Sequence, residues 1–357
     1  MTFQLNSLDD LARAGVDTLI DVRAPLEFAE DHLPGAINLP VLSDAERARI
    51  GTIYKQESPF RARKLGAALV ARNAAAHLEG PLAEMPGGWR PLVYCWRGGQ
   101  RSGAFASILR QIGWRVEIID GGYKRYRALV QAMLYEAAFP APVLLLDGGT
   151  GTAKTEILVR VAAQGGQVID LEALAAHRGS LFGAEGSQPA QKLFESRLAQ
   201  RVRALDPGRP VLIEAESSRI GRVRLPPALW RAMGRAAHVQ IAAPLDARVA
   251  HVRRGYAGFI ADPDRLHATL DALRPLHARA QVDAWQEMLA AGDFDALVRG
   301  LITTHYDPRY ARARAASPPV RRIVLPGLSE ADQEDAATTL LAVMRDLEGA
   351  AARVTAR

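Results

Sequence analysis

A single cysteine, Cys95, ends an apolar segment and begins a short loop rich in glycine. Backbone N–H groups in such a turn form an anion-binding nest, and the N-terminus of a following helix adds positive potential. Both effects, together with arginines in the loop, should lower the pKa of the thiol and hold an oxyanion beside the sulfur. We therefore expect a nucleophilic cysteine, although a lone cysteine is also commonly a small buried apolar residue. The loop consists of Trp96, Arg97, Gly98, Gly99, Gln100, Arg101 and Ser102.

A second glycine-rich turn follows the apolar run 143–147. It fits the phosphate-binding pattern G-x4-G-K-S/T, in which backbone N–H groups cradle phosphates and the lysine reaches the anion. Alanine replaces the last glycine, and it would cost about 1–2 kcal/mol if that position needs a positive φ. The turn thus predicts phosphate binding, and it predicts rapid ATP hydrolysis less well. Lys154 would contact the anion, and the Thr155 hydroxyl would be placed for a metal. Its residues are Gly148, Gly149, Thr150, Gly151, Thr152, Ala153, Lys154 and Thr155.

Polar residues in two further segments are candidates to support the phosphate-binding turn. Two carboxylates end the apolar segment 209–216, where they could hold Mg²⁺ directly or through water, or could simply be solvated. The segment 169–183 carries acidic and basic residues between glycines, including a histidine that could also be structural. No metal site follows with certainty from this pattern. The candidates are Asp170, Glu172, His177, Arg178, Glu214 and Glu216.

The basic residues permit a nucleic-acid partner without requiring one. The net charge is +6, and the chain has 40 arginines but only five lysines, one of them in the phosphate-binding turn. Arginines spaced by three or four positions could track a phosphate backbone from one helix face, although a solvated face explains the same pattern. The candidate nucleic-acid contacts are Arg197, Arg201, Arg219 and Arg222.

Composition limits the class of protein. Hydrophobic residues make up 48% of the 357 residues and charged residues 24%, as in ordinary globular proteins. One cysteine excludes a disulfide within the chain, and this fits a reducing compartment. No run approaches the roughly 20 apolar residues of a membrane span, and the N-terminal segment lacks the pattern of a secretory signal. We therefore expect a cytoplasmic protein with no membrane partner.

Strand and helix patterns alternate along the chain. Short apolar runs at 17–23, 90–96 and 115–120 predict buried strands, and helical patterns cover 63–78 and 101–113. The turn-forming segment 139–142 separates this unit from a second α/β unit with strands at 143–147, 167–171, 209–216, 237–243 and 321–326. The region 262–300 has a helical, amphipathic pattern. The predicted architecture is an α/β parallel-sheet domain at 1–138 and a P-loop NTPase-like α/β domain at 139–357 with a helical C-terminal part.

The N-terminal half resembles a rhodanese domain. The resemblance rests on LIDVRAPLEF (19–28), HLPGAINLP (32–40) and the Cys95 loop. It implies a loop cysteine that carries sulfur or selenium as a persulfide or its selenium analogue. Arg101 lies six positions after Cys95, one more than in a common rhodanese, and Cys-x5-Arg-Ser is also the pattern of cysteine-dependent phosphatases. The domain is thus a rhodanese, a phosphatase, or a rhodanese whose loop accommodates a phosphate-bearing donor.

The order of motifs along nearly the whole chain resembles the tRNA 2-selenouridine synthase family. The resemblance implies exchange of sulfur for selenium in the wobble 2-thiouridine of tRNA, with selenophosphate as donor and no tightly bound cofactor. It also implies an S-geranyl intermediate made from geranyl diphosphate. Cys95 would then act in the selenium step, Gly98, Gly99 and Arg101 would hold the phosphate of selenophosphate, and the P-loop would bind the diphosphate. The supporting motifs are GTIYKQESPFRARKLG (51–66), IDGGYKRYR (119–127), DLEALAAHRGSLFG (170–183), IEAESSRIG (213–221) and HYDPRY (305–310).

Two alternative functions remain open at this stage. The first is a sulfurtransferase or cysteine-dependent phosphatase with a regulatory P-loop kinase-like domain, which would act on small substrates without RNA. The second is a non-catalytic tRNA-binding protein, whose RNA affinity would not depend on Cys95.

Overall fold

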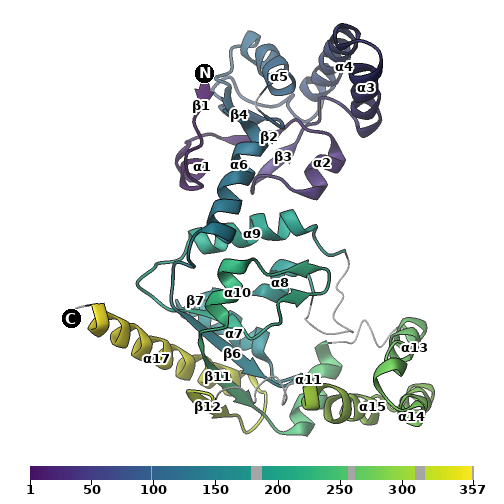
Figure 1. The fold of residues 1–357 in the computed structure, drawn as a ribbon, viewed down its shortest axis with the longest axis vertical. Helices are drawn as coiled ribbons and strands as arrows, with labels where there is room; N and C mark the ends of the chain where they lie inside the picture. Colours follow the sequence, from purple (N-terminus) through teal and green to yellow (C-terminus); the bar gives the residue numbers. More distant parts are fainter. Residues whose placement is uncertain (98, 178–186, 256–261, 310–317, 356–357) are drawn as a thin grey trace. The chain divides into compact units, whose positions relative to one another are not determined.

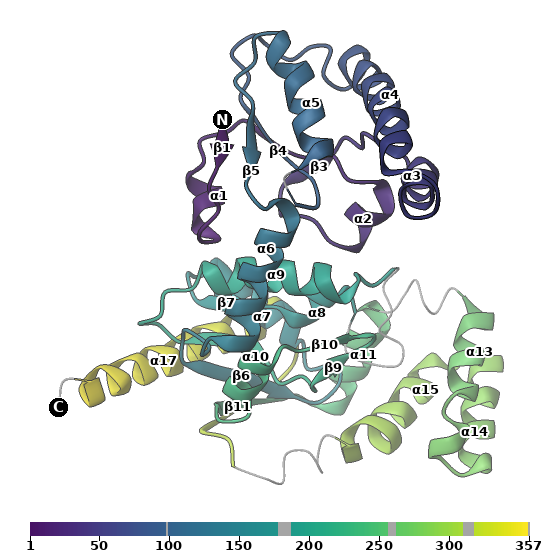
Figure 2. The same cartoon turned by 45° about the horizontal axis from the view of Figure 1, so that its top comes forward.

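The chain folds into two compact units (Figures 1 and 2). The computed structural model describes residues 1–97, 99–177, 187–255, 262–309 and 318–355. Unit 1 comprises Met1–Ala138, Pro189–Ala204 and Pro226–Ala228, and unit 2 comprises Phe139–Gln188, Leu205–Leu225 and Leu229–Arg357.

Unit 1 is built on a sheet whose paired strands are all parallel. In spatial order the strands are β1 (Thr2–Phe3), β5 (Glu117–Ile119), β4 (Pro91–Tyr94), β2 (Thr18–Asp21) and β3 (Ala36–Asn38). The central strand β4 is buried along its whole length, which explains its uninterrupted apolar sequence. The strand therefore delivers Cys95, the next residue, to the carboxyl edge of the sheet.

Helices pack against this sheet. Fully buried Val93 of β4 meets Phe105 and Leu109 of α5 in one core cluster, which continues to Cys95. The helices are α1 (Asp9–Arg13), α2 (Pro25–Glu30), α3 (Asp44–Gln56), α4 (Pro59–Glu79), α5 (Gln100–Gln111) and α6 (Gly122–Gln131), which continues as a π-helical turn over Ala132–Glu136.

Local sequence explains why α3 and α4 form two adjacent helices instead of one (Figure 1). The Ser43 hydroxyl accepts the Glu46 N–H at 3.2 Å, and the Glu46 carboxylate accepts the Ser43 N–H at 2.8 Å. This reciprocal cap starts α3. The Ser58 hydroxyl caps α4 by accepting the Arg61 N–H at 3.3 Å, and Pro59 occupies the first helical position, where it loses no hydrogen bond. The Ser-Pro pair therefore makes the corner between the helices.

Unit 1 also includes α9 (Gln191–Arg203), a helix that the sequence analysis assigns to the second domain. Fully buried Phe194 and Leu198 anchor it. Glu195 of this helix pairs with Arg127 of α6 and accepts the Tyr135 hydroxyl at 2.6 Å. Burial of an ion pair is costly unless its remaining lone pairs are satisfied, and the tyrosine hydroxyl contributes one such contact.

Unit 2 contains a second sheet with parallel pairing throughout. Its strands in spatial order are β12 (Arg321–Val324), β11 (Ala237–Ala242), β6 (Val143–Gly148), β8 (Val211–Glu214) and β7 (Gln167–Ile169). A short antiparallel hairpin is formed by β9 (Arg219–Ile220) and β10 (Val223–Arg224). Because β6 is central, the phosphate-binding turn leaves the middle of the sheet.

Among the described residues, two clusters of apolar side chains contribute to the cores of unit 2. The larger joins Leu146 of β6 and Ile157 of α7 to Leu340 of α17, and the smaller centres on fully buried Val282 and Trp285 in the helical region. The helices are α7 (Lys154–Ala163), α8 (Leu171–Ala175), α10 (Pro227–Met233), α11 (Leu245–Gly255), α13 (Pro263–Asp271), α14 (Arg279–Ala290), α15 (Phe294–Gly300) and α17 (Glu330–Thr355), with a 3₁₀ turn at Arg274–Leu276 and a π-helical turn at Leu301–Tyr306.

The structure confirms the predicted α/β class, the parallel sheets and the helical C-terminal part. The predicted strands correspond to β2, β4 to β8, β11 and β12, with ends shifted by a few residues. The edge strands β1 and β3 were missed because runs of two and three residues carry no periodic signal. Within the described residues, no helix combines the length and the apolar character that a membrane span requires.

Candidate active sites

Cys95 lies at the turn from β4 to α5. Its side chain is 4% exposed, and its sulfur accepts a hydrogen bond from the fully buried Ser102 hydroxyl at 3.2 Å. The Cys95 carbonyl accepts the Tyr123 N–H at 2.9 Å, and the Trp96 carbonyl accepts the Lys124 N–H at 2.9 Å. The beginning of α6 therefore holds the end of β4 in place, and the Trp96 ring packs against that of Tyr123 at 5.3 Å.

The surroundings of Cys95 lower the pKa of its thiol below the ordinary value. Burial raises the pKa, but the hydroxyl and backbone N–H of Ser102, the charge of Arg101 and the Arg97 N–H together outweigh it. The sulfur lies just before the N-terminus of α5, whose first N–H groups have no partner within the helix. Since the thiolate is the nucleophilic form, this geometry supports the predicted role of Cys95.

Arg101, predicted to act with Cys95, is held by a carboxylate. Its Nη1 lies 2.7 Å from Oε2 of Glu27 in α2, and Nε of Arg47 lies 2.7 Å from the same oxygen. Burial raises the pKa of Glu27, but the two arginines, Arg101 foremost, lower it overall. Glu27 therefore stays ionised and orients Arg101. Glu27 lies within the rhodanese-like motif at 19–28, but nothing in its local pattern predicts this role.

The remaining loop residues differ in position. Arg97, Gly99 and Gln100 are exposed and can meet an incoming anion, whereas Trp96 packs on Tyr123. Gly98 lies outside the described residues.

A buried ionic network lies beneath the loop. Arg23 pairs with Asp21 at 2.6 Å, donates to the Asp31 carbonyl at 2.6 Å and lies 4.0 Å from the centre of the Tyr123 ring. The Tyr123 hydroxyl in turn donates to the Asp31 carboxylate at 2.7 Å. These contacts connect the end of β2 to α6, and α6 holds the Cys95 carbonyl. The network gives the quoted Asp21 and Arg23 a positioning role instead of a chemical one.

The phosphate-binding turn joins β6 to α7. Lys154 Nζ lies 2.9 Å from the Gly148 carbonyl, and the Thr152 hydroxyl donates to the Gly149 carbonyl at 2.9 Å. Ala153 has a φ of 59°, in the left-handed region that favours glycine. The strain expected from its replacement of glycine, about 1–2 kcal/mol, therefore applies.

Close packing explains two glycines of the turn. A Cβ on Gly149 would lie 2.7 Å from Nη2 of Arg248, and one on Gly151 would lie 2.6 Å from Val252. Arg248 of α11 donates to the Thr150 carbonyl at 2.9 Å and pairs with Asp307 at 2.6 Å. The sequence analysis missed both Arg248 and Asp307, and only the motif at 305–310 pointed to the latter.

Carboxylates from two strand ends gather next to the phosphate-binding turn. The Thr155 hydroxyl donates to Glu172 at 3.4 Å. Burial, then the charge of Glu216, raises the pKa of Glu172 to about 7, while Lys154 opposes this. The proposed support residues Glu172 and Glu216 thus lie together at the P-loop lysine.

Glu214 and Asp170 have a different surrounding. Glu214 is 1% exposed and accepts the Leu171 N–H at 2.9 Å, and Asp170 caps α8 by accepting the Ala173 N–H at 2.7 Å. Burial, then the charge of Asp170, raises the pKa of Glu214 well above its ordinary value. Through its hydrogen bond with the Leu171 N–H, Glu214 positions the start of α8.

The remaining predicted support residues are His177 and Arg178, and the predicted metal is Mg²⁺. Burial lowers the pKa of His177, which the charge of Glu216 partly offsets. Arg178 lies outside the described residues. Across the described ranges, no three His, Cys, Asp or Glu side chains group in a way that could hold a metal ion. The predicted Mg²⁺ ion at Thr155, Glu214 or Glu216 stays a prediction.

The four candidate tRNA contacts are all exposed. Arg197 and Arg201 lie one turn apart on α9 in unit 1, whereas Arg219 and Arg222 belong to the β9–β10 hairpin in unit 2. They therefore do not form one helix face. The Arg219 side chain donates to the Gly221 carbonyl at 2.7 Å.

These two sites define a class of protein in which a cysteine-loop domain and a P-loop domain share one chain. The rhodanese-like family model matches residues 5–129, and the model of the tRNA 2-selenouridine synthase AAA domain matches residues 141–272. Of the three interpretations of the N-terminal domain, the rhodanese-like one is thus confirmed as its fold.

Three relatives named tRNA 2-selenouridine synthase support a narrower assignment. The protein of Hahella chejuensis is 36% identical over 332 residues, which cover 82% of this chain and 84% of that protein. The Bordetella bronchiseptica protein is 35% identical over 87% of this chain and 91% of its own length. The Nitrosomonas europaea protein is 38% identical over 70% of this chain and 66% of its own length. The chain belongs to the tRNA 2-selenouridine synthase family.

The hydrogen bond from Ser102 can be tested through the only thiol in the chain. Ser102→Ala removes the hydroxyl that stabilises the thiolate, so the pKa of Cys95 should rise by about one unit or more, as a hydrogen bond to a charged group is worth ~1.5–3 kcal/mol. Ultraviolet thiolate absorbance against pH measures this directly. Ser107→Ala, which removes an exposed hydroxyl bonded to the Gly103 carbonyl, is the matched control. An unchanged or lower midpoint in Ser102→Ala would contradict the assignment.

The carboxylates at the P-loop predict a pH-dependent stability. The pKa of Glu172 is about 7 in the folded chain against an ordinary 4.5, so the folded state holds its proton more tightly. Stability should therefore fall as pH rises from about 4.5 through 7. Glu172→Gln removes this dependence and should raise the free energy of unfolding above pH 7 by up to about 3 kcal/mol relative to its effect near pH 4.5. Urea unfolding at both pH values measures it, and an equal effect at both would contradict the interpretation.

Proposed function

We propose that the protein exchanges sulfur for selenium in the wobble 2-thiouridine of tRNA, with selenophosphate as the selenium donor. In this scheme the thiouridine sulfur is first alkylated by geranyl diphosphate, which releases diphosphate. The selenium of selenophosphate then attacks C2 of the base, the C–S bond breaks to release geranyl thiol, and water takes the phosphoryl group as the P–Se bond breaks, which releases phosphate. Alkylation makes the sulfur a better leaving group, which gives one chain a chemical reason to carry two anion sites. The assignment of tRNA as substrate is supported by the family and by the names of the relatives.

The observation that carries the proposal is the acidified thiol at an anion-binding helix terminus. The Cys95 sulfur accepts a hydrogen bond from Ser102 and lies next to the first turn of α5. A phosphate-bearing donor would have its anion held by the backbone N–H groups of the loop and by Arg101, while its selenium lies near the sulfur. Glu27 would keep the Arg101 guanidinium at the edge of the loop as the anion arrives.

The P-loop is proposed to bind the diphosphate of geranyl diphosphate instead of driving ATP hydrolysis. Its Lys154 and backbone N–H groups suit a diphosphate, and the departing pyrophosphate would be stabilised by the same contacts. The strained Ala153 supports a turn specialised away from the common ATPase sequence. With Mg²⁺ bound, Thr155, Glu172 and Glu216 are the side chains that would reach the ion, and the ion would neutralise phosphate charge.

Replacing the cysteine should separate the two steps. Cys95→Ala should abolish 2-selenouridine formation and spare S-geranyl-2-thiouridine, because only the first product depends on the thiol. Mass spectrometry of tRNA nucleosides after incubation with selenophosphate and geranyl diphosphate measures both. Wild-type amounts of selenouridine from the variant would sink the role of Cys95. Turnover of small phosphate esters without RNA would instead support the phosphatase alternative.

Replacing the P-loop lysine should block the first step instead of the second. Lys154→Ala loses the cation that meets the diphosphate, so geranyl transfer to 2-thiouridine should fall at least about 100-fold, the loss typical of one electrostatic contact to a developing anion. The same nucleoside analysis reports the result, and Lys192→Ala, which removes a lysine paired with Glu30, is a control. Rapid ATP hydrolysis by the wild type, or unchanged geranylation by Lys154→Ala, would count against the diphosphate role.

A further inference from the structure

A hollow of about 890 Å³ lies beside the Cys95 loop and is not used by the steps proposed above. It is formed by α3, α4 and the start of α5, all within unit 1. We call it the α3–α4 hollow. Buried Leu42, Ala62 and Val70 contribute apolar surface to its lining. Gln100 and Arg101 of the cysteine loop form one side of it, so an occupant would lie next to the thiol site.

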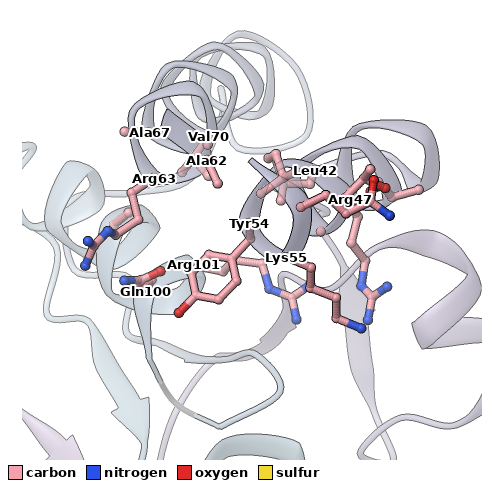
Figure 3. Close-up of a pocket in the computed structure, with 17 residues that line it drawn as sticks. Leu42, Arg47, Tyr54, Lys55, Ala62, Arg63, Ala67, Val70, Gln100 and Arg101 are labelled. Carbon is pink, nitrogen blue, oxygen red and sulfur yellow. The ribbon is translucent and has the colours of Figure 1, made fainter. Parts of the chain in front are cut away.

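The motif at 51–66 builds this hollow. The corner at Ser58 and Pro59 brings the last turn of α3 next to the first turns of α4. Tyr54 and Lys55 of α3 and Arg63 of α4 consequently extend toward Gln100 and Arg101 (Figure 3). The sequence analysis used this motif only as a family signature, and the structure assigns it a place at the site.

The charges around the hollow suit a polyanion. Arg47, Lys55, Arg63 and Arg101 all line it, and none of the described residues that line it is acidic. Glu27 pairs with Arg47 and Arg101. Arg47 and Arg101 therefore converge on this carboxylate, whereas Figure 3 shows Lys55 and Arg63 on either side of the Tyr54 ring. Two cations on either side of a ring match the phosphates that flank one nucleotide.

Tyr54 adds a stacking surface. Its side chain is 53% exposed although it is a large aromatic residue, and it lies among the cations at the rim. Proteins that bind single-stranded nucleic acids combine such rings with a cationic groove, because every base has a π-face. The apolar lining and the aromatic ring together would accept an unstacked base while the rim contacts its flanking phosphates.

We propose that the α3–α4 hollow seats an unpaired nucleotide of the RNA substrate, with its base against Tyr54 and its flanking phosphates against Lys55 and Arg63. The inference rests on the proposed function for the identity of the substrate as RNA. It goes beyond that function by naming the surface that presents the RNA to the cysteine loop. This surface is distinct from the four arginines that the sequence analysis singled out.

The test is direct binding, which needs no selenophosphate or turnover. The probe is an RNA hairpin with 2-thiouridine in its loop, measured by fluorescence anisotropy at several salt concentrations. Tyr54→Ala should weaken binding about 5- to 140-fold, which is the ~1–3 kcal/mol of one base–aromatic stack, and Tyr54→Phe should keep most of the affinity. Lys55→Ala and Arg63→Ala should each reduce the slope of log K against log salt by about 0.7, the value for one single-strand phosphate.

Two neighbouring residues provide matched controls. Phe60 is 71% exposed and Lys64 is exposed on α4, but neither lines the hollow. Phe60→Ala and Lys64→Ala should bind the hairpin as the wild type does. Equal affinities for Tyr54→Ala and Phe60→Ala, or salt slopes unchanged in Lys55→Ala and Arg63→Ala, would overturn the inference. So would a Tyr54→Ala variant that loses affinity for geranyl diphosphate but not for the hairpin.

The outcomes also separate this inference from the proposed function. Wild-type protein that forms selenouridine, with hairpin binding independent of Tyr54, would contradict only the nucleotide site. Hairpin binding that depends on Tyr54, without selenouridine formation by the wild type, would contradict only the proposed reaction.

Discussion

Both candidate sites depend on one constraint: the chain must leave a buried parallel strand and enter a helix within a few residues. In unit 1 this happens between Tyr94 and Gln100, and in unit 2 between Gly148 and Lys154. The first N–H groups of each helix have no partner within the helix, so they point out of the turn and attract an anion. The rest of each unit keeps that turn in place. The same backbone geometry thus underlies both proposed steps, and the side chains around each turn distinguish them.

The two sites differ in how they use burial. At Cys95, burial opposes the thiolate, and hydrogen bonds and a cation compensate for it. At the P-loop, burial and like charge raise the pKa of Glu214 well above its ordinary value and the pKa of Glu172 to about 7. A nucleophile needs its charge, whereas a carboxylate with a raised pKa repels an anion such as the proposed diphosphate less. Burial therefore favours anion binding at the P-loop. At Cys95 it opposes the thiolate, and hydrogen bonds and a cation outweigh it.

Residues that hold the reactive groups make up much of the polar interior. Asp21 and Arg23 form an ion pair whose side chains are almost fully buried. Arg23 packs against the ring of Tyr123, whose backbone N–H donates a hydrogen bond to the Cys95 carbonyl. Arg248 likewise holds the P-loop in place by donating a hydrogen bond to the Thr150 carbonyl. Such buried charges are expensive unless paired, so they are better explained by the precision they give to the loops than by overall stability. The α3–α4 hollow uses Arg101 again, which Glu27 holds between the thiol and the proposed RNA surface.

Contiguous sequence patterns were enough to predict most of the strands, the two turns and the fold class. Cys95 with its loop and the run from Gly148 to Thr155 are single segments, and apolar runs mark the strands that carry them. Only the tertiary structure revealed Glu27, Arg248 and Asp307, whose contacts with Arg101, Thr150 and Arg248 span 74, 98 and 59 positions along the chain. It also decided that α9 packs in unit 1 and that the motif at 51–66 lines a hollow. A periodic pattern depends on residues that lie close together in the sequence. An ion pair between distant segments has no such local pattern, because its two residues meet only when the sheet has formed.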